Sequence, residues 1–294
     1  MKVLIIGNTG FIGRNVFQKL KTLDEINLVG VSTKEIDLTN GESAIALSKH
    51  FSSDCIVVMC AGVKKQLGDT LITFDSNLTI VNNFCKAISR VPPKKILFFS
   101  SASVYGEDVP YLDSITENTR VEPKTYYGIS KYSAERVLSK VCTDNQIELT
   151  ILRPPLVYGK DDTSRGYGPT GFAHHLINNN KITVWGDGGE YREFIYINDV
   201  VNILVIMLNK ESSGLFNLVS GTSYTFKNII DLLNNIVNHK IEVVFCKRTK
   251  QKVDHRYSNE KIANIIGDFK FTDLKDGLSQ TYSLLKKSHV IINE

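Results

Sequence analysis

The segment Lys2-Val-Leu-Ile-Ile-Gly-Asn-Thr-Gly-Phe-Ile-Gly13 decides the fold of this chain. It starts with a short apolar run of the kind found in buried parallel strands. Three glycines follow, and helical periodicity begins at once, with Val16, Phe17 and Leu20 on one side. A glycine-rich turn between a strand and a helix lets the backbone approach a pyrophosphate, whose charge the helix N-terminal amides then bind. The segment therefore predicts a dinucleotide site.

Strands and helices alternate along the rest of the chain, which predicts an α/β fold with a doubly wound parallel sheet. The expected strands cover residues 3–6, 28–31, 55–60, 96–100 and 149–152. The segment Thr39-Asn-Gly-Glu42 is typical of a capping box that opens a helix. Beyond the fifth strand, a loop over residues 161–171 is expected to cover the substrate.

Two domains are expected from this pattern. A dinucleotide-binding domain covers residues 1–160, with returns to its sheet near 193–220, at 193–197 and 215–219. A smaller, interleaved C-terminal lobe over 161–294 is expected to bind mainly the substrate. The length of 294 residues and the hydrophobic content of 42% suit this arrangement.

Composition predicts a cytoplasmic protein that engages neither membranes nor nucleic acids. The chain has no run of about 18 apolar residues, and it begins with a strand rather than a signal segment. The net charge of +4 is modest. The five cysteines form no Cys-x-x-Cys, so reduced thiols are expected. His174-His175 lacks the spacing and the nearby thiols of a metal site, so no metal is expected.

The segment Tyr127-Gly-Ile-Ser-Lys131 places a phenol and an ammonium on one helical face. A free phenol has a pKa of about 10, so acid or base catalysis near neutral pH requires lowering it by roughly 3 units. An ammonium about 6 Å away supplies most of that shift at an effective dielectric of about 20. We therefore expect Lys131 to lower the pKa of Tyr127, so that the pair can move a proton.

Further motifs follow in order, namely Ser100-Ser-Ala-Ser-Val-Tyr-Gly106, Leu152-Arg-Pro154, Val157-Tyr-Gly159 and residues 185–188 and 192–200. With these motifs the chain resembles the extended short-chain dehydrogenases/reductases over nearly its whole length. That family contains nucleotide-sugar epimerases, dehydratases and ketoreductases. The resemblance implies a Rossmann-type fold, a nicotinamide cofactor, a nucleotide-sugar substrate of polysaccharide biosynthesis, and a homodimer formed by two helices that flank the sheet.

The resemblance also assigns the site residues. Catalytic roles fall to Ser101, Tyr127 and Lys131, because a hydroxyl at residue 101 can bind a substrate oxygen beside the phenol. Cofactor contacts are expected from Gly7, Asn8, Thr9, Gly10, Phe11, Ile12, Gly13, Ser32, Lys34, Asp37, Leu38, Ala61, Gly62, Asn77, Tyr127 and Lys131. Substrate contacts are expected from Ser101, Ser103, Arg192 and Arg248.

Five of these residues have a structural alternative. Ser101 could be a turn former at a strand end, and Arg248, in the basic run Lys247-Arg248 with Lys250 and Lys252, could lie on a solvated strand edge. Asp37, which resembles an adenine-contacting acid, could instead cap a helix. Asn77 resembles an asparagine that steadies a bend in the active-site helix, but it could be an ordinary exposed residue. Arg192, whose guanidinium suits a diphosphate, could instead form an ion pair with Glu190 or Asp187.

Missing residues narrow the expected reaction. Dehydratases of this family carry an acidic pair where this chain has Ala102 and Ser103, and the GDP-fucose-synthase type has a cysteine that is missing here. Reduction of a 4-keto sugar or inversion of a 4-hydroxyl is left. Ser32-Thr-Lys34 stands where NAD-preferring members carry an acid, so NADP(H) is favoured over NAD, although Glu35 lies close. We expect NADPH-dependent reduction of a 4-keto-6-deoxy sugar nucleotide. A 4-epimerase with tightly bound NAD and a non-catalytic NADP(H)-binding sensor or scaffold are the alternatives.

Overall fold

The computed structural model describes residues 1–162, 167–178, 180–238 and 240–293, which fall into two compact units. The first unit contains residues 1–107, 119–154 and 201–218. The second contains residues 108–118, 155–200 and 219–294. The chain therefore passes between the units several times, and the expected domain limits of 1–160 and 161–294 stay a prediction.

A six-stranded parallel sheet forms the centre of the first unit, in the order β2-β1-β3-β4-β5-β9. Its strands are β1 (Lys2–Ile6), β2 (Asn27–Val31), β3 (Ile56–Met59), β4 (Lys95–Phe99), β5 (Glu148–Arg153) and β9 (Gly214–Asn217). The five strands predicted from their apolar runs are confirmed to within one residue at each end. Strands β3 and β4 are buried along their whole length, as parallel strands covered on both faces require.

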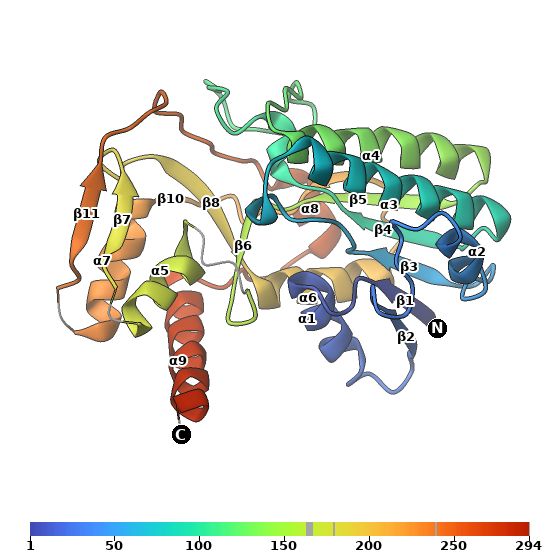
Figure 1. The fold of residues 1–294 in the computed structure, drawn as a ribbon, viewed down its shortest axis with the longest axis horizontal. Coiled ribbons are helices and arrows are strands. Elements are labelled where there is room, and N and C mark those ends of the chain that lie inside the picture. Colours follow the sequence, from blue (N-terminus) through green and yellow to red (C-terminus); the bar gives the residue numbers. More distant parts are fainter. Residues whose placement is uncertain (163–166, 179, 239, 294) are drawn as a thin grey trace. The chain divides into compact units, whose positions relative to one another are not determined.

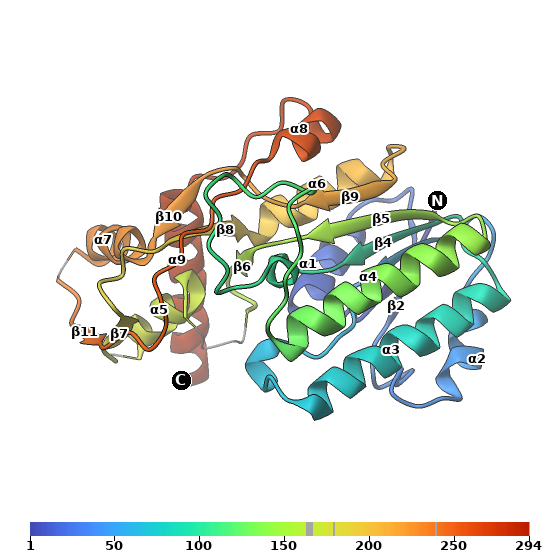
Figure 2. The same ribbon diagram turned by 90° about the horizontal axis from the view of Figure 1, so that it is seen from above.

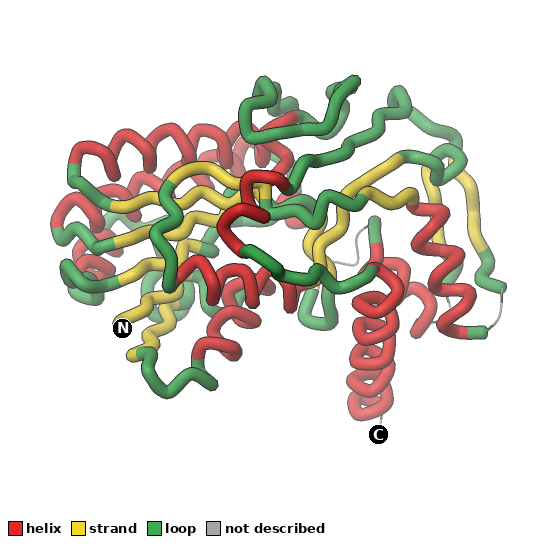
Figure 3. The backbone as a smooth tube through the Cα atoms, turned by 180° about the vertical axis from the view of Figure 1, so that it is seen from behind, coloured by secondary structure: helices red, strands yellow, loops and turns green. Residues whose placement is uncertain are grey.

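Helices cover both faces of this sheet. Figure 1 and Figure 2 show α3 (Leu71–Arg90) and α4 (Tyr126–Asp144) side by side on one face, where α2 (Ser43–Ser48) packs against α3. Helices α1 (Phe11–Leu20) and α6 (Ile197–Leu208) lie on the other face. In Figure 3 the strands of this sheet run between the two helical layers. This three-layer arrangement confirms the predicted Rossmann-type fold.

The strand order reverses at β1, which has β2 on one side and β3 on the other. Doubly wound sheets bind ligands at the carboxyl ends of their strands, next to such a switch point. Gly7 follows β1 and Ala61 follows the end of β3, so both lie at this position. A Cβ added to Gly7, whose φ is +85°, would lie 2.9 Å from the Ala61 nitrogen. The two strand ends can meet because residue 7 has no side chain.

The capping box expected at residues 39–42 is wrong. The Asp37 carboxylate accepts hydrogen bonds from the Thr39 N–H at 2.9 Å and from its hydroxyl at 2.7 Å. These bonds keep the threonine in a local turn, away from any helix terminus. Helix α2 begins only at Ser43, and no side chain caps it.

The second unit contains two small sheets. Strands β6 (Leu156–Tyr158), β8 (Tyr191–Tyr196) and β10 (Ser223–Thr225) form one, in the order β10-β8-β6. In the other, β7 (Ile182–Trp185) pairs in parallel with β11 (Val243–Cys246). The helices of this unit are α5 (Pro169–Ile177), α7 (Phe226–Val237), α8 (Glu260–Ile266) and α9 (Leu274–Asn293). Among the helices described in either unit, none is both long and apolar enough to span a bilayer.

Two expectations for this part of the chain need correction. The return of residues 193–197 to the main sheet is wrong, because β8 pairs with β6 and β10 instead. The buried Glu193 carboxylate helps to hold β8 there, since it accepts hydrogen bonds from the N–H groups of Ser220 and Gly221 on the segment leading to β10. In the loop expected over 161–171, residues 163–166 lie outside the described residues, whereas Pro169 already starts α5.

Candidate active site

The glycine turn after β1 forms a cradle at the N-terminus of α1. A Cβ added to Gly13 would overlap the carbonyl group of Gly7, so the turn closes tightly onto the helix. Helix α1 starts after Gly10 without a side-chain cap and without an acidic residue in its first turn. The Asn8 Oδ1 atom is buried, and no atom of the described residues hydrogen-bonds to it. The open helix amides fit a dinucleotide pyrophosphate, whereas the unsatisfied Asn8 oxygen is an acceptor and suits a hydroxyl group of a ligand.

Asn77 holds the turn that follows β3. Its Oδ1 accepts a hydrogen bond from the Val63 N–H at 2.7 Å, and its Nδ2 donates one to the Val63 carbonyl at 3.1 Å. A Cβ added to Gly62 would lie 3.3 Å from Asn77 Oδ1 and 3.7 Å from Lys131 Nζ. Asn77 is buried, so the exposed alternative is wrong. Its side chain steadies a strand end beside Lys131 rather than a helix bend.

Helix α4 carries Tyr127 and Lys131 on one face. The Thr125 hydroxyl caps this helix by accepting a hydrogen bond from the Gly128 N–H at 3.0 Å. The buried Lys131 Nζ donates a hydrogen bond to the Phe99 carbonyl at 2.8 Å, at the end of β4. It also lies 5.9 Å from the centroid of the Tyr127 ring. The structure thus brings the phenol and the ammonium together at the carboxyl edge of the sheet.

The charge balance of Tyr127 differs from the expectation. Burial raises the pKa of Tyr127 to about 12, while a hydrogen bond with Ser101 lowers it and the Glu107 carboxylate raises it further. The net decrease expected for this pKa is therefore wrong for the chain by itself. Removing a phenolate from water disfavours the ionised form, and this effect of burial is the largest of the three. Tyr127 is a protonated phenol at neutral pH.

The pKa of Lys131 shifts in the opposite direction from that of Tyr127. Burial lowers the pKa of Lys131 to about 8, against the effect of Cys60 and Glu135, which raise it. Burial also raises the pKa of the Cys60 thiol to about 12. Lys131 is therefore the group of this cluster that changes its charge closest to neutral pH.

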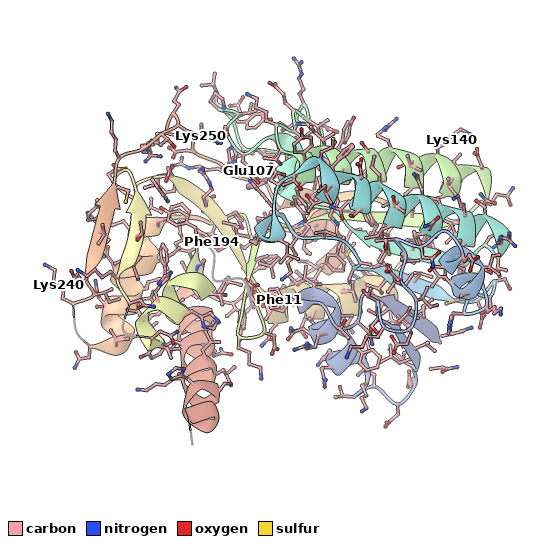
Figure 4. The ribbon with its side chains drawn as sticks, viewed as in Figure 1. Phe11, Glu107, Lys140, Phe194, Lys240 and Lys250 are labelled. Carbon is pink, nitrogen blue, oxygen red and sulfur yellow. The ribbon has the colours of Figure 1, made fainter. Side chains whose placement is uncertain are left out.

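Ser103, in the turn after β4, contacts a carboxylate that sequence reasoning missed. Ser101 precedes the 3-10 turn η2 (Ala102–Tyr105), and its Oγ accepts a hydrogen bond from the Ser103 N–H at 3.1 Å. The Ser103 hydroxyl donates to Glu107 at 3.0 Å. Glu107, labelled in Figure 4, also forms an ion pair with Lys65. No familiar motif marks this pair, because its members lie 42 positions apart.

A second missed residue lies beside the glycine cradle. The Lys64 ammonium is 5.5 Å from the centroid of the Phe11 ring, at the start of α1. Phe11 is labelled in Figure 4. A cation at this place suits an anionic ligand at the helix terminus. Its signal in the sequence is weak, since it is one of two adjacent lysines after the third strand.

The end of β2 differs from what the sequence suggested. The Ser32 N–H donates a hydrogen bond to a Glu35 carboxylate oxygen at 2.6 Å, and the Ser32 hydroxyl donates to the same oxygen. These bonds from Ser32 lower the pKa of Glu35. Glu35 and Lys34 are both exposed. An ionised carboxylate thus occupies the place where hydroxyls were expected to receive a phosphate.

Asp37 is exposed, whereas its neighbour Leu38 is buried. The exposed Asp37 carboxylate accepts the two hydrogen bonds of Thr39 described above, which lower its pKa. The alternative that it caps a helix is wrong, because α2 starts later. The Leu38 side chain is buried in the core cluster of the first unit, and its carbonyl accepts a hydrogen bond from Asn83 at 2.9 Å.

The two arginines expected to bind substrate lie in the second unit. Arg248 forms ion pairs with Glu190 and with Asp187, the latter at 3.3 Å. The ion pair proposed as the alternative for Arg192 is therefore made by another arginine. Arg192 donates hydrogen bonds to the carbonyls of Tyr191, at 2.9 Å, and Val253. Within the described ranges of both units, no three metal-ligating side chains come together.

Comparison with known proteins identifies the family. Residues 3–218 match the sequence profile of the NAD dependent epimerase/dehydratase family. The chain is 26% identical to the GDP-6-deoxy-D-talose 4-dehydrogenase of Aggregatibacter actinomycetemcomitans, over 96% of this chain and 97% of that protein. It is 27% identical to the UDP-glucose 4-epimerase of Bacillus subtilis, over 84% and 86% of the two chains.

The fold is shared with the crystal structure of Thermus thermophilus UDP-glucose 4-epimerase in complex with NAD. The TM-score is 0.86 at 22% identity, and the match covers 97% of this chain and 99% of that one. Together with the profile match over most of the chain, the order of strand, glycine turn, serine turn and Tyr-Lys helix leads to one conclusion. This protein is an enzyme of the NAD dependent epimerase/dehydratase family.

Proposed function

We propose that this enzyme carries out oxidation and reduction at C4 of a nucleotide-activated sugar, with an NAD(P) cofactor. The observation that carries the proposal is the convergence of Ser101, Tyr127 and Lys131 at the carboxyl edge of the sheet, in the unit that holds the glycine cradle. Relatives along nearly the whole chain are named for 4-epimerase and 4-dehydrogenase activities on nucleotide sugars.

The residues around the switch point suit the cofactor. Gly7, Gly13 and Gly62 leave the backbone bare where a pyrophosphate and a ribose approach, and Asn8 offers an unsatisfied buried oxygen. Lys64 adds a positive charge next to this cradle. When bound, the nicotinamide supplies the hydride acceptor or donor for C4.

Three side chains would handle the proton. Tyr127 would give its proton to O4 in the reducing direction, and as the phenolate it would take the proton of the 4-hydroxyl in the oxidising direction. The Ser101 hydroxyl would bind the same substrate oxygen, O4, because it lies beside the phenol, with which it hydrogen-bonds. Lys131 stabilises the phenolate formed during the transfer, since its ammonium lies 5.9 Å from the ring centroid.

The end of β2 favours epimerisation with tightly bound NAD. The Glu35 carboxylate is fixed by Ser32 and ionised, and it lies 22 positions beyond Gly13 in sequence. Acids at this place in dinucleotide-binding folds accept hydrogen bonds from the ribose hydroxyls and repel a 2′-phosphate. Several solved structures with the same fold are 4-epimerases in complex with NAD.

Reduction of a 4-keto-6-deoxy sugar nucleotide by NADPH is the second candidate. It is favoured by the protonated state of Tyr127, because a neutral phenol is ready to donate its proton to a ketone oxygen. Thr33 and Lys34 add a hydroxyl and an ammonium that suit a 2′-phosphate. In the second unit, Arg192 is the guanidinium that we propose for the substrate diphosphate in either reaction.

One experiment separates the two reactions. Denaturing the purified protein and analysing the released nucleotide is expected to give about one NAD per chain if it is an epimerase. A reductase would release little and would oxidise NADPH when given 4-keto-6-deoxy nucleotide sugars. The substrates to test for epimerisation are UDP-glucose and UDP-galactose.

Tyr127→Phe is the control for both reactions. It should lower turnover by roughly 10² to 10⁴-fold, the usual size of a general acid–base contribution. Binding of the nicotinamide nucleotide should persist. Wild-type turnover in Tyr127→Phe, or a protein that binds neither nucleotide, would refute the proposed function.

A further inference from the structure

Three consecutive residues at the end of β4 contact three residues of α4. The Phe99 carbonyl accepts a hydrogen bond from Lys131, and the Ser100 hydroxyl donates one to Glu135 at 2.5 Å. Ser101 forms the hydrogen bond with Tyr127. The three partners on α4 stand at successive intervals of four residues, so they share one helical face. Figure 2 shows α4 lying along β4 and β5.

Of the three residues on this face of α4, Glu135 is the one that has no role in the proposed chemistry. It is 3% exposed, and its carboxylate accepts two hydrogen bonds from Arg153, from Nε at 2.9 Å and from Nη2 at 2.6 Å. Arg153 is also 3% exposed and stacks on the Tyr105 ring at 4.8 Å. The Tyr105 hydroxyl in turn donates to Asn217 at 2.7 Å. The buried pair thus has polar and aromatic partners on both sides.

A buried ion pair is a weak source of stability, because desolvation of two charges offsets most of their attraction. Its fixed geometry is the more specific property. The planar guanidinium on β5 grips both carboxylate oxygens, and this resists rotation of α4 about its own axis. The same rotation would move Tyr127 away from Ser101 and Lys131 away from Phe99.

We propose that Glu135 and Arg153 are positioning residues, which lock α4 in the one rotational setting that brings Tyr127 and Lys131 to the end of β4. The inference rests on the proposed function for the roles of those two residues. The Glu135–Arg153 pair itself touches no reacting atom. It acts through the face of the helix that it holds.

The pair also sets the charge around Lys131. The groups that face this ammonium are Cys60 after β3, the Phe99 carbonyl on β4, and Tyr127 and Glu135 on α4. Glu135 raises the pKa of Lys131, against burial. Cys60 and Tyr127 stay protonated up to about pH 12. Replacing Glu135 by a neutral residue removes the attraction and leaves the Arg153 cation without its partner, so Lys131 should lose its proton at lower pH.

The test compares Glu135→Gln, which keeps the shape and removes the charge, with Glu135→Asp, which keeps the charge. Asp144→Asn is the matched control, because Asp144 pairs with Lys140 on the exposed part of the same helix, where Figure 4 labels Lys140. The readout is the dissociation constant of NADH, measured by its fluorescence from pH 6 to pH 10. It requires no sugar substrate, so it is independent of the proposed reaction.

In the wild type, NADH affinity should change with a midpoint near pH 8, where Lys131 titrates. Glu135→Gln should move this midpoint down by at least about one unit, the usual effect of removing an opposite charge at close range. Glu135→Asp should restore it, and Asp144→Asn should leave it unchanged. A wild-type midpoint in Glu135→Gln, with only a lower melting temperature, would overturn the proposal and leave a purely structural pair.

If Glu135→Gln does not fold, Ser100→Ala tests the same contacts between β4 and α4. This variant keeps the Glu135 carboxylate, so Arg153 is not left as an unpaired buried charge. Loss of one hydrogen bond to the buried carboxylate should lower the melting temperature and weaken NADH binding roughly threefold or more, measured at a temperature where the variant is fully folded. Wild-type affinity in Ser100→Ala would overturn the proposal in that case. Absence of sugar turnover, with the expected NADH results, would instead refute the proposed function alone.

Discussion

Gly13, in the first turn of α1, packs directly against the backbone carbonyl of Gly7 at the end of β1. This contact closes the turn between strand and helix and aims the first amides of α1 at one point. The chain can adopt it because neither residue carries a Cβ, and because Gly7 adopts a positive φ of +85°. The cradle proposed for the pyrophosphate therefore depends on two residues six positions apart.

Gly13→Ala should disrupt this cradle. The added methyl group meets backbone rather than a mobile side chain, so overpacking of about 1–3 kcal/mol is expected, together with loss of NADH binding. Gly41→Ala is the matched control, because a Cβ there has no neighbour within 4 Å. Melting temperature and NADH fluorescence measure both effects. Equal behaviour of the two variants would contradict the role assigned to the contact.

Glu35→Gln should change the cofactor preference. Neutralising the carboxylate removes the repulsion of a 2′-phosphate, so the affinity for NADP should rise relative to NAD by at least about tenfold. Glu42→Gln, at an exposed position before α2, should leave the ratio unchanged. Dissociation constants for both nucleotides test this, and an unchanged ratio in Glu35→Gln would show that Glu35 does not select the cofactor.

Glu107 and Lys65 should shift the ionisation of Tyr127 in opposite directions. The Glu107 carboxylate raises the pKa of Tyr127, so Glu107→Gln should let the phenolate form at lower pH. Lys65→Gln leaves the carboxylate without its cation, so the phenolate should form at higher pH. Tyrosinate absorbance, with Tyr127→Phe protein as the reference, follows this titration. Shifts of the same sign in both variants would contradict the assignment.

Glu193 should make the stability of the second unit depend on pH. Burial raises the pKa of Glu193 from 4.5 to about 7, although hydrogen bonds from Ser220, Gly221 and Ser223 lower it. Because the folded pKa is the higher one, the stabilising contribution is complete below pH 4.5 and is lost as the pH rises through 7. A difference of about 2.5 units corresponds to on the order of 3 kcal/mol.

Glu193→Gln should therefore raise the melting temperature at pH 8 and leave it nearly unchanged at pH 4.5. The amide oxygen can still accept the bonds from Ser220 and Gly221. Glu242→Gln, at an exposed position paired with Lys181, should show no such pH dependence. A melting temperature of Glu193→Gln that parallels the wild type at every pH would exclude the buried carboxylate as the cause.

Much of the first unit follows from local sequence alone. Apolar runs gave the strands β1 to β5 to within a residue, since a parallel strand covered on both faces needs apolar side chains throughout. The spacing of Tyr127 and Lys131 predicted their common helical face, because residues four positions apart lie on the same side of any α-helix. The three glycines gave the turn. In each case the physical cause lies within a few neighbouring positions.

Only the tertiary structure decided the charges and partners around these elements. Burial, which depends on how α4 packs, turned the expected decrease in the pKa of Tyr127 into an increase. Arg153 pairs with Glu135, which lies 18 positions away in sequence. Arg248 pairs with the two carboxylates that were only the alternative partners of Arg192. Desolvation and long-range pairing are properties of the packed chain, so no spacing of residues along the sequence encodes them.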